Sequence, residues 1–409
     1  MINWSSDRVT GPKPAQAGPL DRSTARRPRP SRFVFRLLFS VFCLLFSLSS
    51  AQSFFNSRAL GELVLPADAR VAGFGAPSAL SYENPGILVD LSSVSFTGTA
   101  LAAAAIGEQA GRTRFVENVR PAGFHAAAPL PLDMRLMLGV DERFNQDFDL
   151  WSEPTADTSY RYHVFSHGGV YALRCGVGWS FLRLGAVGLE YNRLLGSGRE
   201  DWQFEVANGR YVSTDTVELD YSGNLLRFGG SLQTDRFTFA SHYTPGFSMT
   251  VNSVRHIHGV IEDSIRTYGV HIPGAVSFGA SISPFERVTA VLGYELRPWS
   301  TMAVDGLEMV GVSNSYRVSA GAEYLTGQIP VRFGYSYSPW YFLAQDSSPI
   351  AEHRLHLGCS LPVKGFGSLG LSAEVGRRSS AALSETSIRL MLSLAYHEAW
   401  LKRTRRWGY

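Results

Sequence analysis

The chain of 409 residues is long enough for one large domain or for two or three of ordinary size. Its composition, with 45% hydrophobic, 12% aromatic and only 18% charged residues and with 40 glycines, is typical of many strands and turns. Residues 1–51 carry a net charge of +6, so the net charge of +3 leaves −3 for the rest of the chain, and the overall basic charge gives no indication of a nucleic-acid partner.

Residues 1–51 have the three parts of a secretory signal peptide. A basic stretch is followed by an apolar run over 37–48 and then by small residues that end at Ala51. The run is shorter than the roughly 20 residues that a membrane-spanning helix needs, so a retained anchor is the weaker interpretation. We predict cleavage after Ala51 and export to the bacterial outer membrane.

From residue 92 to 400, short segments repeat in which every second residue is large and apolar. In the last of them, 387–400, Ile388, Leu390 and Leu392 alternate with residues that include Arg389. About 14 such segments can be counted. Short, turn-rich links alternate with longer connections, which are predicted to be loops over 142–160, 193–213, 244–271, 298–314 and 338–352.

The two faces of these predicted strands differ in charge. The phase opposite the large apolar residues carries the arginines at 135, 174, 227, 317, 332, 354 and 389. One arginine facing lipid near mid-bilayer costs about 2–4 kcal/mol, so these side chains must face a lumen or water. A soluble sandwich and a transmembrane barrel both satisfy this condition.

Three observations favour the barrel over the sandwich. The charged rows hold few lysines, although soluble sheets commonly protect their edges with lysine. Aromatic residues such as Trp179, Tyr324, Tyr396 and Trp400 lie near predicted strand ends, as they do at membrane interfaces, and a signal peptide precedes the strands. We predict an all-β transmembrane antiparallel β-barrel of about 14 strands over 92–400, with both ends periplasmic and a basic periplasmic tail over 401–409.

A barrel of this size leaves a wide interior, and its inward phase is rich in glycine, so another part of the chain must fill it. Residues 52–91 lack sustained alternation and are predicted to form a hatch, or plug, inside the lumen. The stretch "ADARVAGFGAPSALSYENPG" resembles the amino-terminal hatch of the FadL-like outer-membrane transport proteins and of the related PorV and PorQ proteins. The matching hatch residues are Arg70, Gly73, Gly75, Asn84 and Pro85, whereas the chain departs from the family pattern at Pro77 and Gly86.

The resemblance implies a channel for passive uptake of hydrophobic or lipid-like compounds of the long-chain fatty-acid type, gated by the hatch. It implies as partners hydrophobic small molecules, outer-membrane lipids and the barrel assembly machinery, and it implies no cofactor. Ligands would first meet a groove among the loops 193–213 and 244–271, where Phe247 and Met249 offer apolar contact unless they serve ordinary loop packing. The PorV branch implies an alternative, an outer-membrane component of a protein secretion system that binds secretion proteins.

The inward phase also offers candidate ligand residues. An arginine row could recognise a carboxylate head group, but acidic residues share the phase, so ion pairs that hold the hatch are the simpler alternative. The residues concerned are Arg317, Glu323, Arg332, Arg354, His356, Glu374 and Arg389.

Two histidine pairs have weaker functional interpretations. His256 and His258 could bind metal or lie in exposed polar surface. His163 and His167, with Asp147 or Asp149, would be the candidates in a barrel enzyme, yet no catalytic spacing singles them out. We therefore predict no catalytic residue, no metal and no enzyme activity.

Overall fold

The computed structural model describes residues 53–57, 60–64, 68–87, 93–109, 112–152, 160–181, 184–206, 212–260, 263–344, 347–363, 367–380 and 383–398. The predicted signal peptide, the basic tail and Trp400 lie outside these residues. Within them no helix is long and apolar enough to cross a membrane. In the described ranges the helical elements are α2 (Ala69–Gly73) and three short 3-10 turns, η1 (Phe54–Ser57), η2 (Ser78–Leu80) and η4 (Trp299–Thr301).

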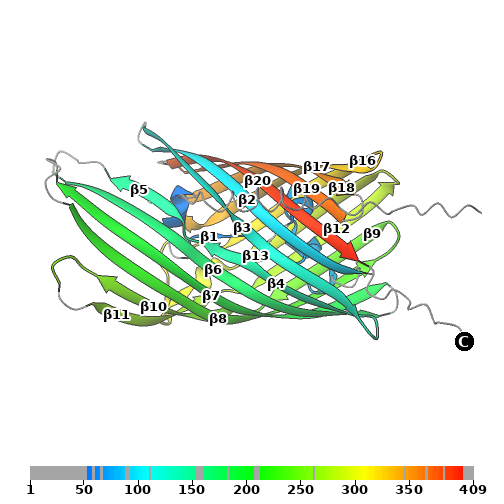
Figure 1. The fold of residues 1–409 in the computed structure, drawn as a ribbon, viewed down its shortest axis with the longest axis horizontal. Helices are drawn as coiled ribbons and strands as arrows, with labels where there is room; N and C mark the ends of the chain where they lie inside the picture. The colour runs from blue at the N-terminus through cyan, green and yellow to red at the C-terminus, as the bar shows by residue number, and fades with distance from the viewer. Residues whose placement is uncertain are drawn as a thin grey trace, which may run out of the picture. The chain divides into compact units, whose positions relative to one another are not determined.

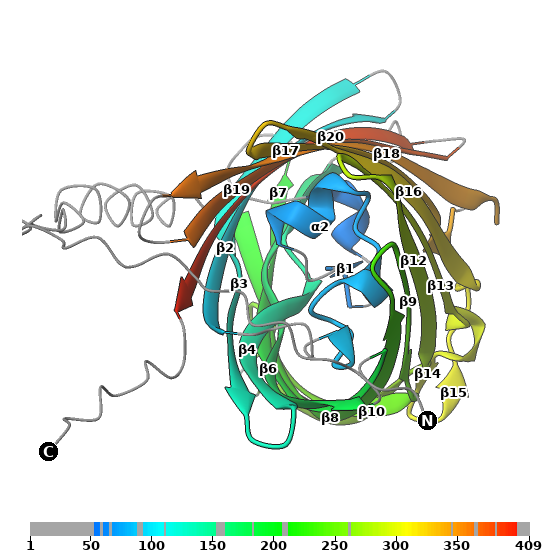
Figure 2. The same cartoon turned by 90° about the vertical axis from the view of Figure 1, so that its right-hand side faces the viewer.

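One antiparallel sheet closes on itself to form a barrel (Figures 1 and 2). Closure occurs at β2 (Val94–Gln109), which pairs with β3 (Arg112–Leu130) on one side and with β20 (Leu383–Glu398) on the other. The other wall strands are β4 (Met134–Asn145), β5 (Phe148–Ser152), β6 (Tyr160–Phe181), β7 (Gly185–Val206), β8 (Val212–Gln233), β9 (Phe237–Thr244), β10 (Phe247–His256), β11 (Ser264–Ile272), β12 (Ala275–Phe285), β13 (Val288–Arg297), β16 (Ser315–Thr326), β17 (Ile329–Leu343), β18 (Pro349–Val363) and β19 (Gly367–Ser379).

Two wall strands are interrupted at the same level by a Pro-Gly dipeptide. Pro245 and Gly246 separate β9 from β10, and Pro273 and Gly274 separate β11 from β12 on the neighbouring strand. Proline has no N–H to donate to a ladder, so the strands break there. With each interrupted pair counted as one strand and β5 as the continuation of β4, the barrel has 14 strands. The prediction of an antiparallel barrel of about 14 strands is confirmed, and a two-sheet sandwich is excluded.

The outer surface carries a belt of large apolar side chains. Leu292, Phe333 and Leu390 are exposed by 62%, 55% and 56%, and equivalent residues occur on every side of the barrel. An apolar surface of this extent is stable against lipid rather than water. Inside the belt, the opposite phase carries buried charged residues such as Arg174 and Glu190, as the alternation predicts.

Beyond the Pro-Gly level, the polarity of the wall is reversed. Along β10, Thr250 and Asn252 are exposed, whereas Met249 and Val251 are buried in the interior. We call this end of the barrel the loop end, and the opposite end, which carries Val94 and Glu398, the turn end. Strands β6, β7, β8, β10 and β11 reach furthest toward the loop end (Figure 1).

This reversal explains why the predicted loops 193–213 and 244–271 are wrong. They form the hairpins β7–β8 and β10–β11, so Phe247 and Met249 lie in a strand rather than in a loop. Likewise, 142–160 contains β5, and 338–352 contains the ends of β17 and β18. Only 298–314 is mainly a connection, with the small strands β14 (Ala303–Val304) and β15 (Leu307–Glu308). An assignment of outward and inward positions from lipid-facing residues no longer holds where the strand extends beyond the lipid.

Candidate functional site

The described part of the N-terminal segment, residues 53–57, 60–64 and 68–87, lies inside the barrel (Figure 2). Its helix α2 begins where the Asp68 carboxylate accepts a hydrogen bond from the Val71 N–H at 2.8 Å. α2 lies against β17–β20, whereas η2 lies against β9, β12 and β13. The short strand β1 (Glu62–Leu63) pairs with β4. The segment therefore contacts opposite parts of the wall.

Glycines on the inner surface allow this close contact. A Cβ atom at Gly334 would lie 2.4 Å from the Gly75 nitrogen, and one at Gly229 would lie 2.1 Å from the Asn84 Oδ1. Both distances are too short for any side chain. The glycines with such contacts, which we call the glycine belt, are Gly188, Gly229, Gly279, Gly293, Gly321 and Gly334; at Gly358 and Gly370 the nearest atom of the segment would be 3.0 Å and 3.2 Å away.

The residues that match the hatch motif have distinct positions. Asn84 is fully buried; its side-chain amide donates to the Ala79 carbonyl at 2.9 Å and to the Gly230 carbonyl at 3.1 Å. Pro85 contacts the backbone of the wall at Gly188, which belongs to the glycine belt. Gly73, the last residue of α2, contacts the wall at Gly358, and Gly75, which follows the helix, contacts the wall at Gly334, whereas Arg70 in α2 is exposed.

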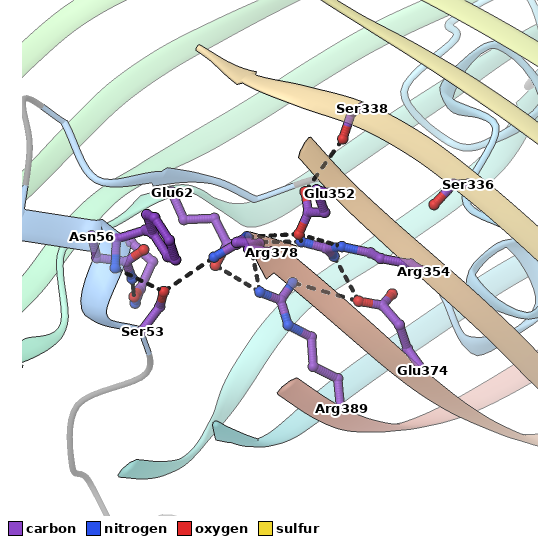
Figure 3. A network of polar contacts seen from close by, with 12 residues as sticks. Ser53, Asn56, Glu62, Ser336, Ser338, Glu352, Arg354, Glu374, Arg378 and Arg389 are labelled. Carbon is purple, nitrogen blue, oxygen red and sulfur yellow. Dashed lines mark hydrogen bonds and ion pairs between the residues drawn. The ribbon is translucent and has the colours of Figure 1, made fainter. Parts of the chain in front are cut away.

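Glu62 is the centre of a buried ionic network (Figure 3). Its carboxylate is 2% exposed and accepts from Arg389 at 2.6 Å, from Arg354 at 3.0 Å and from Arg378. The same arginines bind wall carboxylates, for example Arg354 to Glu374 at 2.6 Å. Burial would raise the pKa of Glu62, which belongs to no membrane-spanning strand, but the guanidinium groups hold that pKa well below its ordinary value.

Two further polar contacts join the N-terminal segment to the wall. The carboxylate of Glu83 is buried between Arg143 and Arg227, with the Arg227 nitrogen at 3.2 Å. The Ser78 hydroxyl donates to Glu295 at 2.7 Å and lies 2.6 Å from the hydroxyl of Ser277 in β12. Together with Glu62, these contacts hold the segment at three places.

The predicted lumen residues are brought together, and ion pairs dominate their geometry. Arg332 binds Glu323 at 2.7 Å. His356 lies 3.0 Å from the hydroxyl of Ser336 and 3.3 Å from Glu374. Arg317 instead donates to the Gly75 carbonyl at 3.1 Å, and it is the one member of the predicted arginine row without a carboxylate partner among the described residues.

Sequence reasoning missed an apolar chamber at the loop end. The cavity has a volume of about 410 Å³ and is lined mainly by apolar side chains of β8, β10, β11 and 302–309, with Leu60 of the N-terminal segment and with Glu200 and Arg266 among its polar members. Met249 belongs to the surrounding apolar cluster, and Phe247 packs against it. The available signals were the two Pro-Gly dipeptides and the reversed alternation after them.

A group of packed aromatic rings lies between this chamber and the ionic network, in the apolar cluster around the chamber. The rings of Trp299 and Tyr341 are 4.3 Å apart, and the ring of Trp340 lies 5.3 Å from that of Tyr341. The Tyr341 hydroxyl donates to the carbonyl of Gly61 in the N-terminal segment. These aromatic residues also line a cavity of about 120 Å³ that reaches Glu62 and Arg317.

A small hairpin, β14–β15, contributes to one side of the chamber. Asp305 in its turn accepts from the Gly269 N–H at 2.8 Å and from Arg266 at 3.0 Å. These two hydrogen bonds lower the pKa of the exposed Asp305 carboxyl, because both favour its charged form. The carboxylate thus adds two hydrogen bonds to the backbone pairing of β14 with β11.

The wall has a break between β3 and β4. Their pairing ends at Gly123 and Asp141, after which β3 pairs only with β2, while β4 turns inward and buries Glu142. Side chains cross the break. Arg120 binds Glu142 at 2.7 Å, and the Asn118 amide donates to Asp147 at 2.7 Å.

The histidine pairs do not form a recognisable catalytic or metal centre. His163 lies 2.8 Å from Asp149, but the neighbouring Ser166 has its side chain buried. His256 pairs with Asp263 at 2.7 Å, and no group of three His, Cys, Asp or Glu residues in the described ranges could hold a metal ion.

Comparison with known proteins shows the fold but no close relative. No family model and no curated protein sequence matches the chain. Among solved structures, a Pseudomonas aeruginosa FadL homologue has a TM-score of 0.60 at 12% identity, over 82% of this chain and 99% of that chain. The Pseudomonas putida toluene transporter TodX has a TM-score of 0.56 at 14% identity, over 82% and 99%. The Ralstonia pickettii toluene transporter TbuX has a TM-score of 0.53 at 13% identity, over 86% and 99%. The chain therefore has the fold of these FadL-type barrels, and the resemblance drawn from the hatch motif is confirmed at the level of the fold.

Proposed function

We propose that the protein is an outer-membrane channel for the passive uptake of hydrophobic compounds. In this proposal the chain reaches the outer membrane after cleavage of the predicted signal peptide. The observation that carries this proposal is the apolar chamber of about 410 Å³ at the loop end, above a lumen of buried charges. Transfer from water into such a chamber is favourable for an apolar molecule, at about 25 cal/mol per Å² of apolar surface buried. The named activities of TodX and TbuX, which are toluene transporters, support this class of ligand.

In this proposal the N-terminal segment is the hatch. It occupies the lumen below the chamber, and its polar contacts at Glu62, Ser78 and Glu83 can be exchanged for water without breaking an apolar core. Ligand entering from the chamber contacts Leu60, two residues before Glu62. Movement of the hatch would then connect the chamber with the break between β3 and β4, where ligand leaves sideways through the wall.

Pinning the hatch to the wall tests the proposal. The hydroxyls of Ser78 and Ser277 are already 2.6 Å apart, so the double variant Ser78→Cys, Ser277→Cys places two thiols at disulfide distance with little change in volume. Cells that depend on this protein for uptake are given toluene or oleate, with the variant oxidised or reduced. We expect uptake to stop in the oxidised form and to return after reduction.

Each single-cysteine variant serves as a control, because it changes the same site without a cross-link. Uptake that continues at the wild-type rate with the disulfide formed would refute gating by the hatch. Uptake of neither compound by the reduced or the wild-type protein would refute the channel itself. Comparison of oleate with toluene decides whether long-chain fatty acids are among the ligands.

A further inference from the structure

A broad apolar groove lies over β17–β20, β2 and β3, and its exposed members belong to the outward phase of these strands. Its volume is about 630 Å³. Its sides include Phe333, Leu357 and Leu390, each more than half exposed, and its lining includes the small outward residues Ala102 and Ala373. The hollow arises because alanines occupy outward positions whose neighbours on the same face are Leu and Phe.

A basic and aromatic cluster lies on the same face, nearer the loop end. Arg377 in β19 and His353 in β18 face each other in the ladder, and both are exposed on the outside. The Tyr335 hydroxyl lies 2.7 Å from the His353 Nδ1, and the ring of Tyr337 lies 5.0 Å from the ring of His353. We call these four residues the Arg377 cluster. Among the described residues no carboxylate lies within ion-pair distance of Arg377.

The cluster and the groove are aligned along the same strands. Going down β19, the outward residues are Arg377, Val375 and then Ala373 in the groove. Four residues at about 3.4 Å each place the guanidinium roughly 14 Å along the strand from the groove. Tyrosines at the level of the cluster are typical of the membrane interface, so Arg377 and His353 lie at the level of the head groups and the groove lies in the hydrocarbon.

We propose that this surface binds a phosphate-bearing lipid of the leaflet at the loop end. The phosphate is held by Arg377 and His353, and one acyl chain lies in the groove. A guanidinium matches phosphate geometry with parallel N–H donors, and an unmatched arginine at the interface has a strong electrostatic preference for such a group. The charge distinguishes this occupant from a neutral hydrophobe, which would leave Arg377 without an anion.

Native mass spectrometry of the purified full chain, titrated with dioleoyl phosphatidic acid in detergent, measures this binding. The test variants are Arg377→Gln, which removes the charge, and Ala373→Phe, which fills the groove. Arg193→Gln is the matched control, because Arg193 is also at the outer surface, on β7, where it donates to Asn224 at 3.0 Å. Dioleoylglycerol serves as the same lipid without phosphate.

We expect Arg377→Gln to weaken phosphatidic acid binding by about tenfold, the range of one charge-assisted contact, while Arg193→Gln binds as wild type. Ala373→Phe should weaken binding by a similar factor, about tenfold, because the acyl chain loses apolar contact in the filled groove. Dioleoylglycerol should bind wild type and Arg377→Gln equally. All these residues face outward, so we expect every variant to fold, which gel mobility without heating compared with mobility after heating would show. Ala102→Phe replaces Ala373→Phe if the latter fails to fold.

Three results would overturn the proposal. Equal effects of Arg377→Gln and Arg193→Gln would mean that lipid is held by general surface charge. Complete displacement by millimolar inorganic phosphate, with no effect of Ala373→Phe, would mean that the cluster binds a free anion. Loss of a dimer in Ala373→Phe without any change in lipid binding would assign the groove to a second copy of the chain.

Discussion

Glu62 of the N-terminal segment and Arg389 of the last wall strand form a buried ion pair in which one guanidinium nitrogen of Arg389 lies 2.6 Å and 2.7 Å from the two oxygens of Glu62. Because Arg354 and Arg378 bind the same carboxylate, a single residue of the N-terminal segment partly neutralises the charge of three wall arginines (Figure 3). The position of the segment and the charge balance of the lumen therefore depend on each other.

Replacing Glu62 by Gln should loosen the segment with little change in shape. Removal of one partner from a buried ionic group costs about 3–5 kcal/mol, and we expect the lower end because wall carboxylates remain beside the arginines. Hydrogen exchange of the Val64 amide, which donates to the Arg143 carbonyl at 2.9 Å, reports this loosening. Glu308→Gln changes an exposed carboxylate and should leave that exchange unaltered. Equal exchange in both variants would contradict a role of Glu62 in holding the segment.

The glycine belt predicts a steric effect of a single methyl group. In Gly334→Ala the new Cβ would lie 2.4 Å from backbone atoms of Phe74 and Gly75, which cannot rotate away. We expect a loss of about 1–3 kcal/mol in the stability of the docked segment and a rise in ion conductance across planar bilayers. Gly98→Ala is the control, since a Cβ there meets nothing within 4 Å. Unchanged conductance in Gly334→Ala would show that the belt does not set the position of the segment.

Asp305 predicts a pH dependence of the β14–β15 hairpin. The pKa of its carboxyl is lowered in the folded protein by the Gly269 N–H and by Arg266. The stabilisation is therefore fully present above the ordinary pKa of about 3.9 and is lost as the pH falls through the lowered value. Hydrogen exchange in 302–309, corrected for its intrinsic pH dependence, should rise below pH of about 4. Asp305→Asn should show fast exchange at every pH. Asp235→Asn, in an exposed turn, should behave as wild type. If exchange in the wild-type hairpin did not depend on pH, the Asp305 carboxylate would not stabilise the hairpin.

The alternation of apolar and charged residues was sufficient to predict the barrel, because lipid imposes the same outward phase on every strand that crosses it. For example, Leu390 is exposed in the outer apolar belt, whereas its neighbour Arg389 faces the lumen and forms an ion pair with Glu62. Above Pro245 and Pro273 no lipid enforces that phase. A single rule for inside and outside therefore failed where Met249 and Val251 face inward.

The partners within the lumen could not be read from the sequence. Arg354, Arg378 and Arg389 are separated from Glu62 by about three quarters of the chain, and they meet it because β1 is placed beside them in the closed barrel. The resemblance to the hatch motif indicated Gly75 and Asn84, but it did not explain why these residues are needed at their positions. That reason lies in the wall, where Gly334 and Gly229 leave room for them.

The chamber gives the most direct prediction about transport, because inward and outward residues alternate along β10. Val251 lines the chamber and is fully buried, whereas its neighbour Thr250 is exposed on the outside. In Val251→Asn a polar amide replaces apolar surface without adding a charge, and the matched variant Thr250→Asn makes the same new side chain on the other face. Desolvation of the amide by an apolar ligand costs about 1–3 kcal/mol, so toluene uptake at low concentration should fall roughly tenfold in Val251→Asn alone. Equal uptake by the two variants would place the ligand path outside the chamber.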